Sequence, residues 1–193
     1  MNKQNKTKLL TYNAILIAIT VLVGAVPQLG FIQIPNMTAI TVMHIPVIIA
    51  GILFGMFSSV ITSLAFGVTS MLVAMSRGFG IDLMFMNPVV SVLPRFIFGI
   101  FVGLLYTFIK RFKMDDKLKI AITAFLSSIF HTAIVLTILF VVMGFSDVAE
   151  FLAANKAGFW LFIAPNLLVA LGEAIAAVVI TTPVVLALRR VIR

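Results

Sequence analysis

The amino-acid sequence predicts an all-α integral membrane protein, a bundle of six transmembrane helices. Of its 193 residues, 62% are hydrophobic and 10% are charged, and the mean hydropathy is +1.23, whereas soluble domains are roughly 45–50% apolar and about 25% charged. No Asp, Glu, Lys or Arg occurs between Leu9 and Ser76, a stretch long enough for three spans of about 20 residues each. Lipid offers no partners to unpaired backbone groups, so these spans are expected to be helical. The composition excludes soluble enzymes and nucleic-acid-binding domains.

Helix-breaking residues divide the chain into the expected elements. Pro27, Gly30 and Pro35 interrupt the first apolar run and predict a non-helical connection between the first two helices, on the extracellular side. A tight return at Gly55 separates the second helix from the third. We expect the whole chain, residues 1–193, to form a single membrane domain. The six helices are expected at about residues 9–26, 40–55, 58–75, 88–109, 118–143 and 158–188.

The basic residues predict how the chain is oriented. Eleven of the fourteen Lys and Arg residues lie near the N-terminus, between residues 110 and 119, or near the C-terminus. An even number of spans puts these three regions on one side, and Lys and Arg accumulate on the cytoplasmic side of a membrane. Both termini are therefore expected in the cytoplasm, with the chain in a bacterial plasma membrane and no nucleic acid as partner. Alternatively, the N-terminal lysines and the apolar run up to VGAV form a secretory signal, which would leave five spans.

Four polar side chains fall inside the expected spans, where an ionisable group costs several kcal/mol unless it meets water, a partner or a ligand. From the rise of a helix, Arg95 and Asn166 lie about 10 Å from the outer ends of their helices. By the same measure, His131 and Glu173 lie about 20 Å deep, near the middle of the membrane.

The functional interpretation is a ligand cavity open to the outside between the last three helices. Arg95 would bind an anionic group through its two-pronged donor geometry. His131 and Asn166 would serve hydroxyl or amide groups of the ligand, and Glu173 is also a candidate for contact with it. His44 and Asn87, at outer helix ends, would add donors from the rim.

The buried polar residues can also be explained by purely structural roles. Arg95 would extend its side chain outward to the lipid head groups, or would pair with Glu173 and only hold helices together. His131 and Asn166 would bridge helices through hydrogen bonds. Glu173 would then be structural, a contact between two helices, rather than a residue that contacts the ligand.

Several signals of other functions are missing from the sequence. It has no Gly-Lys-Ser/Thr phosphate loop, no metal-binding pattern and no cysteine, so we expect no cofactor, no metal and no ATP hydrolysis by the chain itself. A binding subunit that needs an energised partner fits these absences. The alternatives are a stand-alone permease and a membrane-embedded lipid enzyme with His131 and Glu173 as an acid/base pair.

Three features together resemble the substrate-specificity subunits (S components) of energy-coupling-factor (ECF) vitamin importers. They are the motif HIPVIIAGILFG, the motif FMNPVVSVLPRFIFG, and two alanines four residues apart on the first helix, Ala14 and Ala18. The resemblance implies a binding subunit, not an enzyme, which works with a transmembrane coupling subunit and two ATPase subunits. It also implies that Ala14 and Ala18 contact the coupling subunit, that the first connection caps the ligand, and that the subunit topples in the membrane to release it.

The resemblance is strongest to the pantothenate-type members. A buried Arg95 with imidazole and amide neighbours suits a small flexible acid that bears hydroxyls and an amide. The single Trp and both Tyr residues lie away from the expected cavity, which disfavours flat heterocycles that stack on large aromatic rings. Pantothenate is the expected ligand, and folate or a pyridoxine-like or hydroxymethylpyrimidine-like vitamin is the alternative.

Overall fold

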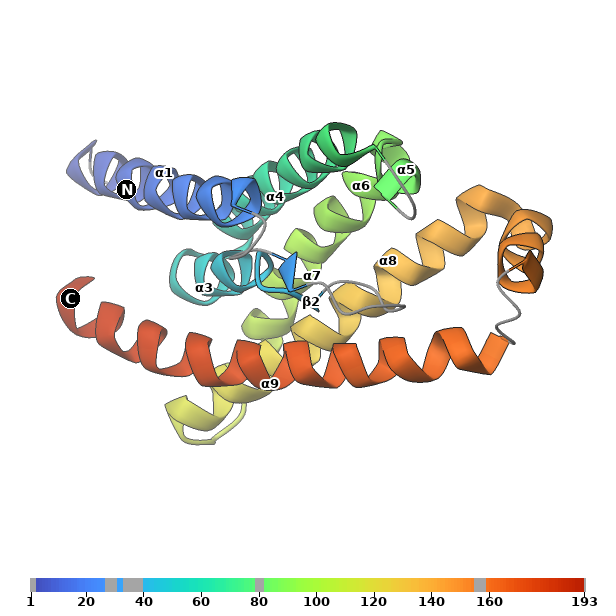
Figure 1. Ribbon diagram of the computed structural model, residues 1–193. Coiled ribbons are helices and arrows are strands. Elements are labelled where there is room, and N and C mark those ends of the chain that lie inside the picture. Colours follow the sequence, from blue (N-terminus) through green and yellow to red (C-terminus); the bar gives the residue numbers. More distant parts are fainter. Residues whose placement is uncertain (1–2, 27–30, 33–39, 79–81, 155–158, 193) are drawn as a thin grey trace.

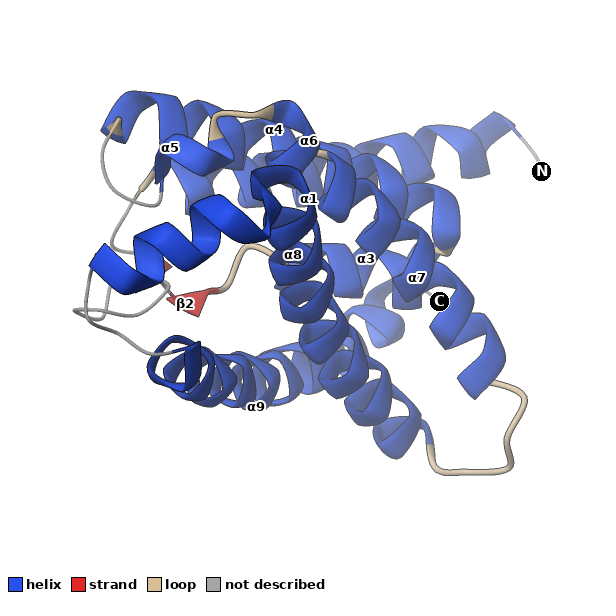
Figure 2. Cartoon of the chain, turned by 90° about the vertical axis from the view of Figure 1, so that its right-hand side faces the viewer, coloured by secondary structure: helices blue, strands red, loops and turns tan. Residues whose placement is uncertain are grey.

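The computed structural model describes residues 3–26, 31–32, 40–78, 82–154 and 159–192, and these are almost entirely helical (Figures 1 and 2). Within them, the only strands are β1 and β2, which form a two-stranded antiparallel sheet, and β2 lies against α9. The elements are α1 (Lys3–Ala25), β1 (Phe31–Ile32), β2 (Ile40–Thr41), α3 (Ile45–Phe54), α4 (Met56–Arg77), α5 (Asp82–Phe85), α6 (Pro88–Ser91), α7 (Leu93–Ile109), α8 (Asp116–Ala154) and α9 (Phe159–Ile192).

The described residues hold five helices that are long and apolar enough to cross a membrane. The second expected helix, about 40–55, is instead the ten-residue α3, which is half the length of a full span. The expected six full spans are therefore not confirmed. The five candidate spans are residues 7–25 of α1, α4, α6 with α7, residues 116–142 of α8 and residues 166–192 of α9.

The short helix α3 lies inside the bundle. Its residues Ile45–Ile52 are all buried, so protein rather than lipid surrounds it. The helix begins at Ile45 with Pro46 in its first turn, and ends at Gly55, whose positive φ of 88° stops it. Helix α1 begins and α9 ends on the same side of the molecule (Figure 1).

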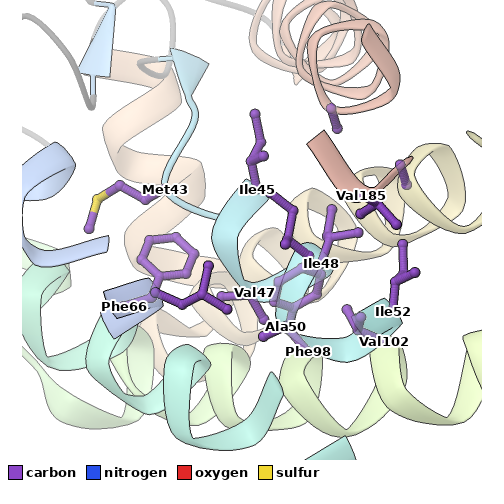
Figure 3. Close-up of a cluster of buried hydrophobic side chains, with 14 of the residues drawn as sticks. Met43, Ile45, Val47, Ile48, Ala50, Ile52, Phe66, Phe98, Val102 and Val185 are labelled. Atoms are coloured by element: carbon purple, nitrogen blue, oxygen red, sulfur yellow. The ribbon is translucent and has the colours of Figure 1, made fainter. Parts of the chain in front are cut away.

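Buried apolar side chains gather around α3 and form the core. Figure 3 shows side chains of α3 close to Phe66 of α4 and to Phe98 and Val102 of α7. The fully buried members with the largest side chains include Phe66, Phe98, Met43, Ile48 and Ile120. This core fixes the end of the β2–α3 connection against α4 and α7, which is where the polar side chains of interest lie.

Helices α4 and α7 pack at very short distance because glycines face α4. A Cβ atom on Gly99 would lie 2.8 Å from the Cα of Val60, and one on Gly103 would lie 2.5 Å from the Cα of Met56. Real Cβ contacts are longer than this. Close approach lets the hydroxyl of Ser59 donate a hydrogen bond of 2.7 Å to the backbone carbonyl of Gly99. The two helices therefore form one closely joined pair.

Some helix bounds differ from those expected from the sequence. Helix α1 begins at Lys3 rather than near residue 9, and α8 continues to Ala154 rather than ending near residue 143. The connection expected to cap the ligand, after Pro27, lies outside the described residues except for β1.

Candidate ligand-binding site

Arg95 is held inside the protein at the start of α7. Its side chain is 5% exposed, and its Nη1 donates a hydrogen bond of 3.1 Å to the backbone carbonyl of Val90. The guanidinium carbon lies 5.2 Å from the ring centre of Phe66 and 5.3 Å from that of Phe85, within the range of a cation–π interaction. Arg95 thus does not extend outward to lipid head groups.

Arg95 also forms no direct ion pair with a carboxylate among the described residues, and Glu173 interacts with it only at longer range. The ion pairs found there join Arg77 with Asp82, and Asp116 with Lys119 and Arg189. The Nε atom of Arg95 is buried and has no hydrogen-bond partner in the described part of the chain. A buried cation in this state is suited to receive an anionic group.

Two histidines stack on each other close to this cation, and Phe66 contacts both Arg95 and one of them, His131. The rings of His44 and His131 stack with centres 5.5 Å apart and an angle of 10° between their planes. His44, directly before α3, has its Nε2 3.1 Å from the hydroxyl oxygen of Ser128. His44 is fully buried, so it does not lie at the rim where the sequence placed it.

His131 on α8 is enclosed by aromatic rings. Its ring centre lies 5.3 Å from that of Phe66 and 5.0 Å from that of Phe98. Neither ring nitrogen has a hydrogen-bond partner among the described residues, although the side chain is 3% exposed. A buried polar atom without a partner costs about 1–3 kcal/mol. A bound molecule that hydrogen-bonds the ring nitrogens of His131 would remove this cost.

Glu173 on α9 is buried too, but both of its carboxylate oxygens have partners. Oε1 accepts a hydrogen bond of 2.6 Å from the backbone N–H of Thr41, and Oε2 accepts one of 3.0 Å from the hydroxyl of Thr132. The carboxylate therefore joins β2, α8 and α9. Among the described residues Glu173 forms no direct ion pair with Arg95, although the two charges still interact electrostatically at longer range.

The two asparagines have different surroundings. Asn166 is buried on α9. Asn87 is exposed, and its side-chain oxygen accepts a hydrogen bond of 2.9 Å from the N–H of Val89, so it caps α6. The structure thus gives Asn87 a local role at a helix start.

The structure brings Arg95, His131 and His44 together, with Phe66 in contact with both Arg95 and His131. Sequence reasoning missed Phe66, and the hydroxyls of Ser128 and Thr132. Only the hydroxyl of Ser128 had a signal, because Ser128 lies three residues before His131 on α8 and shares a face with it, whereas Thr132 directly follows His131 and points to another face. No sequence signal pointed to Phe66, since a phenylalanine in an apolar helix cannot be distinguished by its pattern from any other lipid-facing or core residue.

Comparison with known families identifies the class of protein. The sequence model of one family, the substrate-specific component of ECF transporters, matches residues 8–185. The chain belongs to this family. No curated protein matches it. As an ECF substrate-specific component, it is a multi-pass membrane protein and the substrate-binding subunit of an importer, not an enzyme, and it associates with an ECF module of membrane and ATPase subunits.

Proposed function

We propose that this ECF substrate-specific component binds a small water-soluble vitamin that carries a carboxylate, with pantothenate as the first candidate. The observation that carries the proposal is the buried guanidinium of Arg95, which forms no direct ion pair with a carboxylate among the described residues. A buried cation is costly in a membrane protein unless something neutralises it. An incoming carboxylate would do so.

The neighbours of Arg95 fit the rest of such a molecule. The guanidinium would bind the carboxylate in a two-pronged arrangement, and the ring nitrogens of His131 would serve a hydroxyl or amide group. Rings of Phe66 and Phe98 would contact the apolar part of the ligand. Pantothenate combines these groups in one flexible chain. Folate or a pyridoxine-like or hydroxymethylpyrimidine-like vitamin is the second candidate, since phenylalanine rings also stack on flat heterocycles.

Calorimetric titration of the purified protein tests this proposal without nucleotide or partner. Pantothenate is compared with panthenol, the same molecule with an alcohol in place of the carboxylate. We expect tight binding of pantothenate, weak binding of panthenol, and a loss of at least tenfold in pantothenate affinity in Arg95→Ala. Arg111→Ala is the control, because Arg111 is exposed beyond the end of α7. Undiminished affinity in Arg95→Ala would refute the carboxylate role.

We further propose that α1 contacts the membrane subunit of the ECF module through Ala14 and Ala18, with both termini in the cytoplasm. Both alanines are exposed on α1, and small residues four apart allow another helix to approach closely. The double variant Ala14→Leu with Ala18→Leu is expected to abolish co-purification with the module while ligand binding persists. Ala133→Leu, the same change at an exposed position of α8, is the control. Loss of both properties in the double variant would contradict the docking role.

A further inference from the structure

We infer that Glu173 is a positioning residue, whose carboxylate holds the chain segment that leads into α3 and thereby sets where His44 lies in the ligand site. This inference rests on the proposed function, because it concerns the geometry of the same site. It differs from the expectation that Glu173 contacts the ligand.

The contacts of the carboxylate are the first support. Glu173 is 3% exposed, and its two oxygens bond the backbone N–H of Thr41 at 2.6 Å and the hydroxyl of Thr132 at 3.0 Å. Thr41 is the last residue of β2, and its own hydroxyl accepts a hydrogen bond of 3.3 Å from the N–H of Met43. The bond from Glu173 therefore acts on backbone that continues directly into α3.

The second support is the position of His44 at the other end of this segment. His44 lies three residues after Thr41, its Nε2 is 3.1 Å from the hydroxyl oxygen of Ser128, and its ring stacks on His131. Ser128 and Thr132 are one turn apart on α8. One face of α8 thus anchors both ends of the segment, directly at His44 and through Glu173 at Thr41.

A direct role of Glu173 in ligand binding is less consistent with these contacts. Each of its oxygens already accepts a hydrogen bond from the protein, and a carboxylate beside an acidic ligand would repel it. Removal of the carboxylate would leave the Thr41 N–H buried without an acceptor. Such a group favours local opening of the backbone around it.

Hydrogen–deuterium exchange of the ligand-free protein in detergent tests the inference. We expect Glu173→Ala to speed exchange of the Thr41 amide about tenfold, with exchange in α7 unchanged. Glu173→Gln is expected to exchange like the wild type, because its amide oxygen accepts from Thr41 and its NH₂ group donates to Thr132. Unchanged exchange at Thr41 in Glu173→Ala would overturn the inference.

Pantothenate titration of the same variants separates positioning from contact. A positioning role predicts that Glu173→Gln binds within about threefold of the wild type and Glu173→Ala at least tenfold more weakly. Equal loss in both variants would show that the charge itself meets the ligand, and would overturn the inference. If the wild type does not bind pantothenate, the vitamin proposal fails, while the exchange data still decide the role of Glu173.

A second pair of variants covers the case in which Glu173→Ala does not fold. Thr132→Val leaves the carboxylate bonded to Thr41 alone, whereas Thr132→Ser keeps the hydroxyl. Faster exchange at Thr41 in the valine variant only would support the inference. Equal exchange in the two variants would overturn it.

Discussion

The hydroxyl of Ser63 on α4 donates a hydrogen bond to the backbone carbonyl of Arg95 on α7. One turn along the same helix pair, Ser59 donates to the carbonyl of Gly99. Both hydroxyls are fully buried. The backbone that carries the buried cation is therefore fixed to α4, the helix that also contributes Phe66 to the site. The contacts that pack α4 against α7 thus also fix the position of the ligand-binding charge of Arg95.

Replacement of Ser63 by alanine is predicted to lower stability and, to a lesser extent, ligand affinity. The lost hydrogen bond is worth about 1 kcal/mol, and a small shift of Arg95 is expected to weaken pantothenate binding a few-fold. Thermal unfolding in detergent and calorimetry measure the two effects. Ser76→Ala is the control, since the hydroxyl of Ser76 is exposed and donates within its own helix, to the carbonyl of Val73. A similar loss of stability and affinity in Ser76→Ala would contradict a specific role of the Ser63 hydrogen bond between α4 and α7.

Replacement of Gly99 by alanine is predicted to destabilise the protein more strongly. The added Cβ would lie 2.8 Å from the Cα of Val60 and from the Cβ of Ser63, so α4 and α7 would have to move apart, at a cost of about 1–3 kcal/mol. Gly172→Ala is the matched control, because no atom of the described residues lies within 4 Å of the corresponding Cβ. Alanine there is expected to raise stability by up to about 1 kcal/mol. Thermal unfolding of the two variants should change in opposite directions.

Arg189 joins the ends of α7, α8 and α9, and this contact is predicted to contribute little to the stability of the protein. Its Nη1 lies 3.1 Å from Oδ2 of Asp116, and its Nη2 donates to the hydroxyl of Tyr106. Exposed ion pairs contribute about 0–1 kcal/mol and are screened by salt. Asp116→Asn is therefore expected to change the unfolding temperature slightly at low salt and not at high salt. A large effect that persists at high salt would show that the contact anchors the helices.

The long helices were predictable from the sequence, but the length of α3 was not. Runs without charge and their interruption at Gly55 and Pro88 indicate where apolar helices start and stop. The motif HIPVIIAGILFG has the same continuous apolar pattern whether its helix is surrounded by lipid or by protein. The periodicity of its apolar residues therefore cannot distinguish a short buried helix from part of a membrane span. Only the packing of α4, α7 and α9 around α3 decides this.

The members of the site were only partly predictable. Polar residues in an apolar chain pointed to Arg95, His131 and Glu173, and helical rise gave their depth along the helices. Helical rise says nothing about a chain that enters the bundle in extended form, which is why His44 was expected at the rim. The backbone N–H of Thr41, which bonds Glu173, belongs to no side-chain pattern and leaves no trace in the sequence.

Replacement of His131 by phenylalanine separates stability from function. In the described residues the imidazole nitrogens have no partner, and rings of Phe66, Phe98 and His44 surround the side chain. A phenylalanine would remove buried unpaired polar atoms from an aromatic environment, so the unfolding temperature is expected to stay or to rise. Pantothenate affinity is expected to fall at least tenfold, because a hydrogen-bonding group of the site is lost.

His44→Phe is the comparison that makes the His131 prediction specific. His44 has a partner in Ser128, so its replacement should lower the unfolding temperature, because the buried hydroxyl of Ser128 would lose that partner. Opposite effects of the two histidine variants on stability, measured in the same detergent, would indicate that the imidazole of His44 supports the fold through Ser128 whereas that of His131 does not. A His131→Phe protein that is destabilised but binds pantothenate normally would show that the imidazole serves the fold and not the ligand.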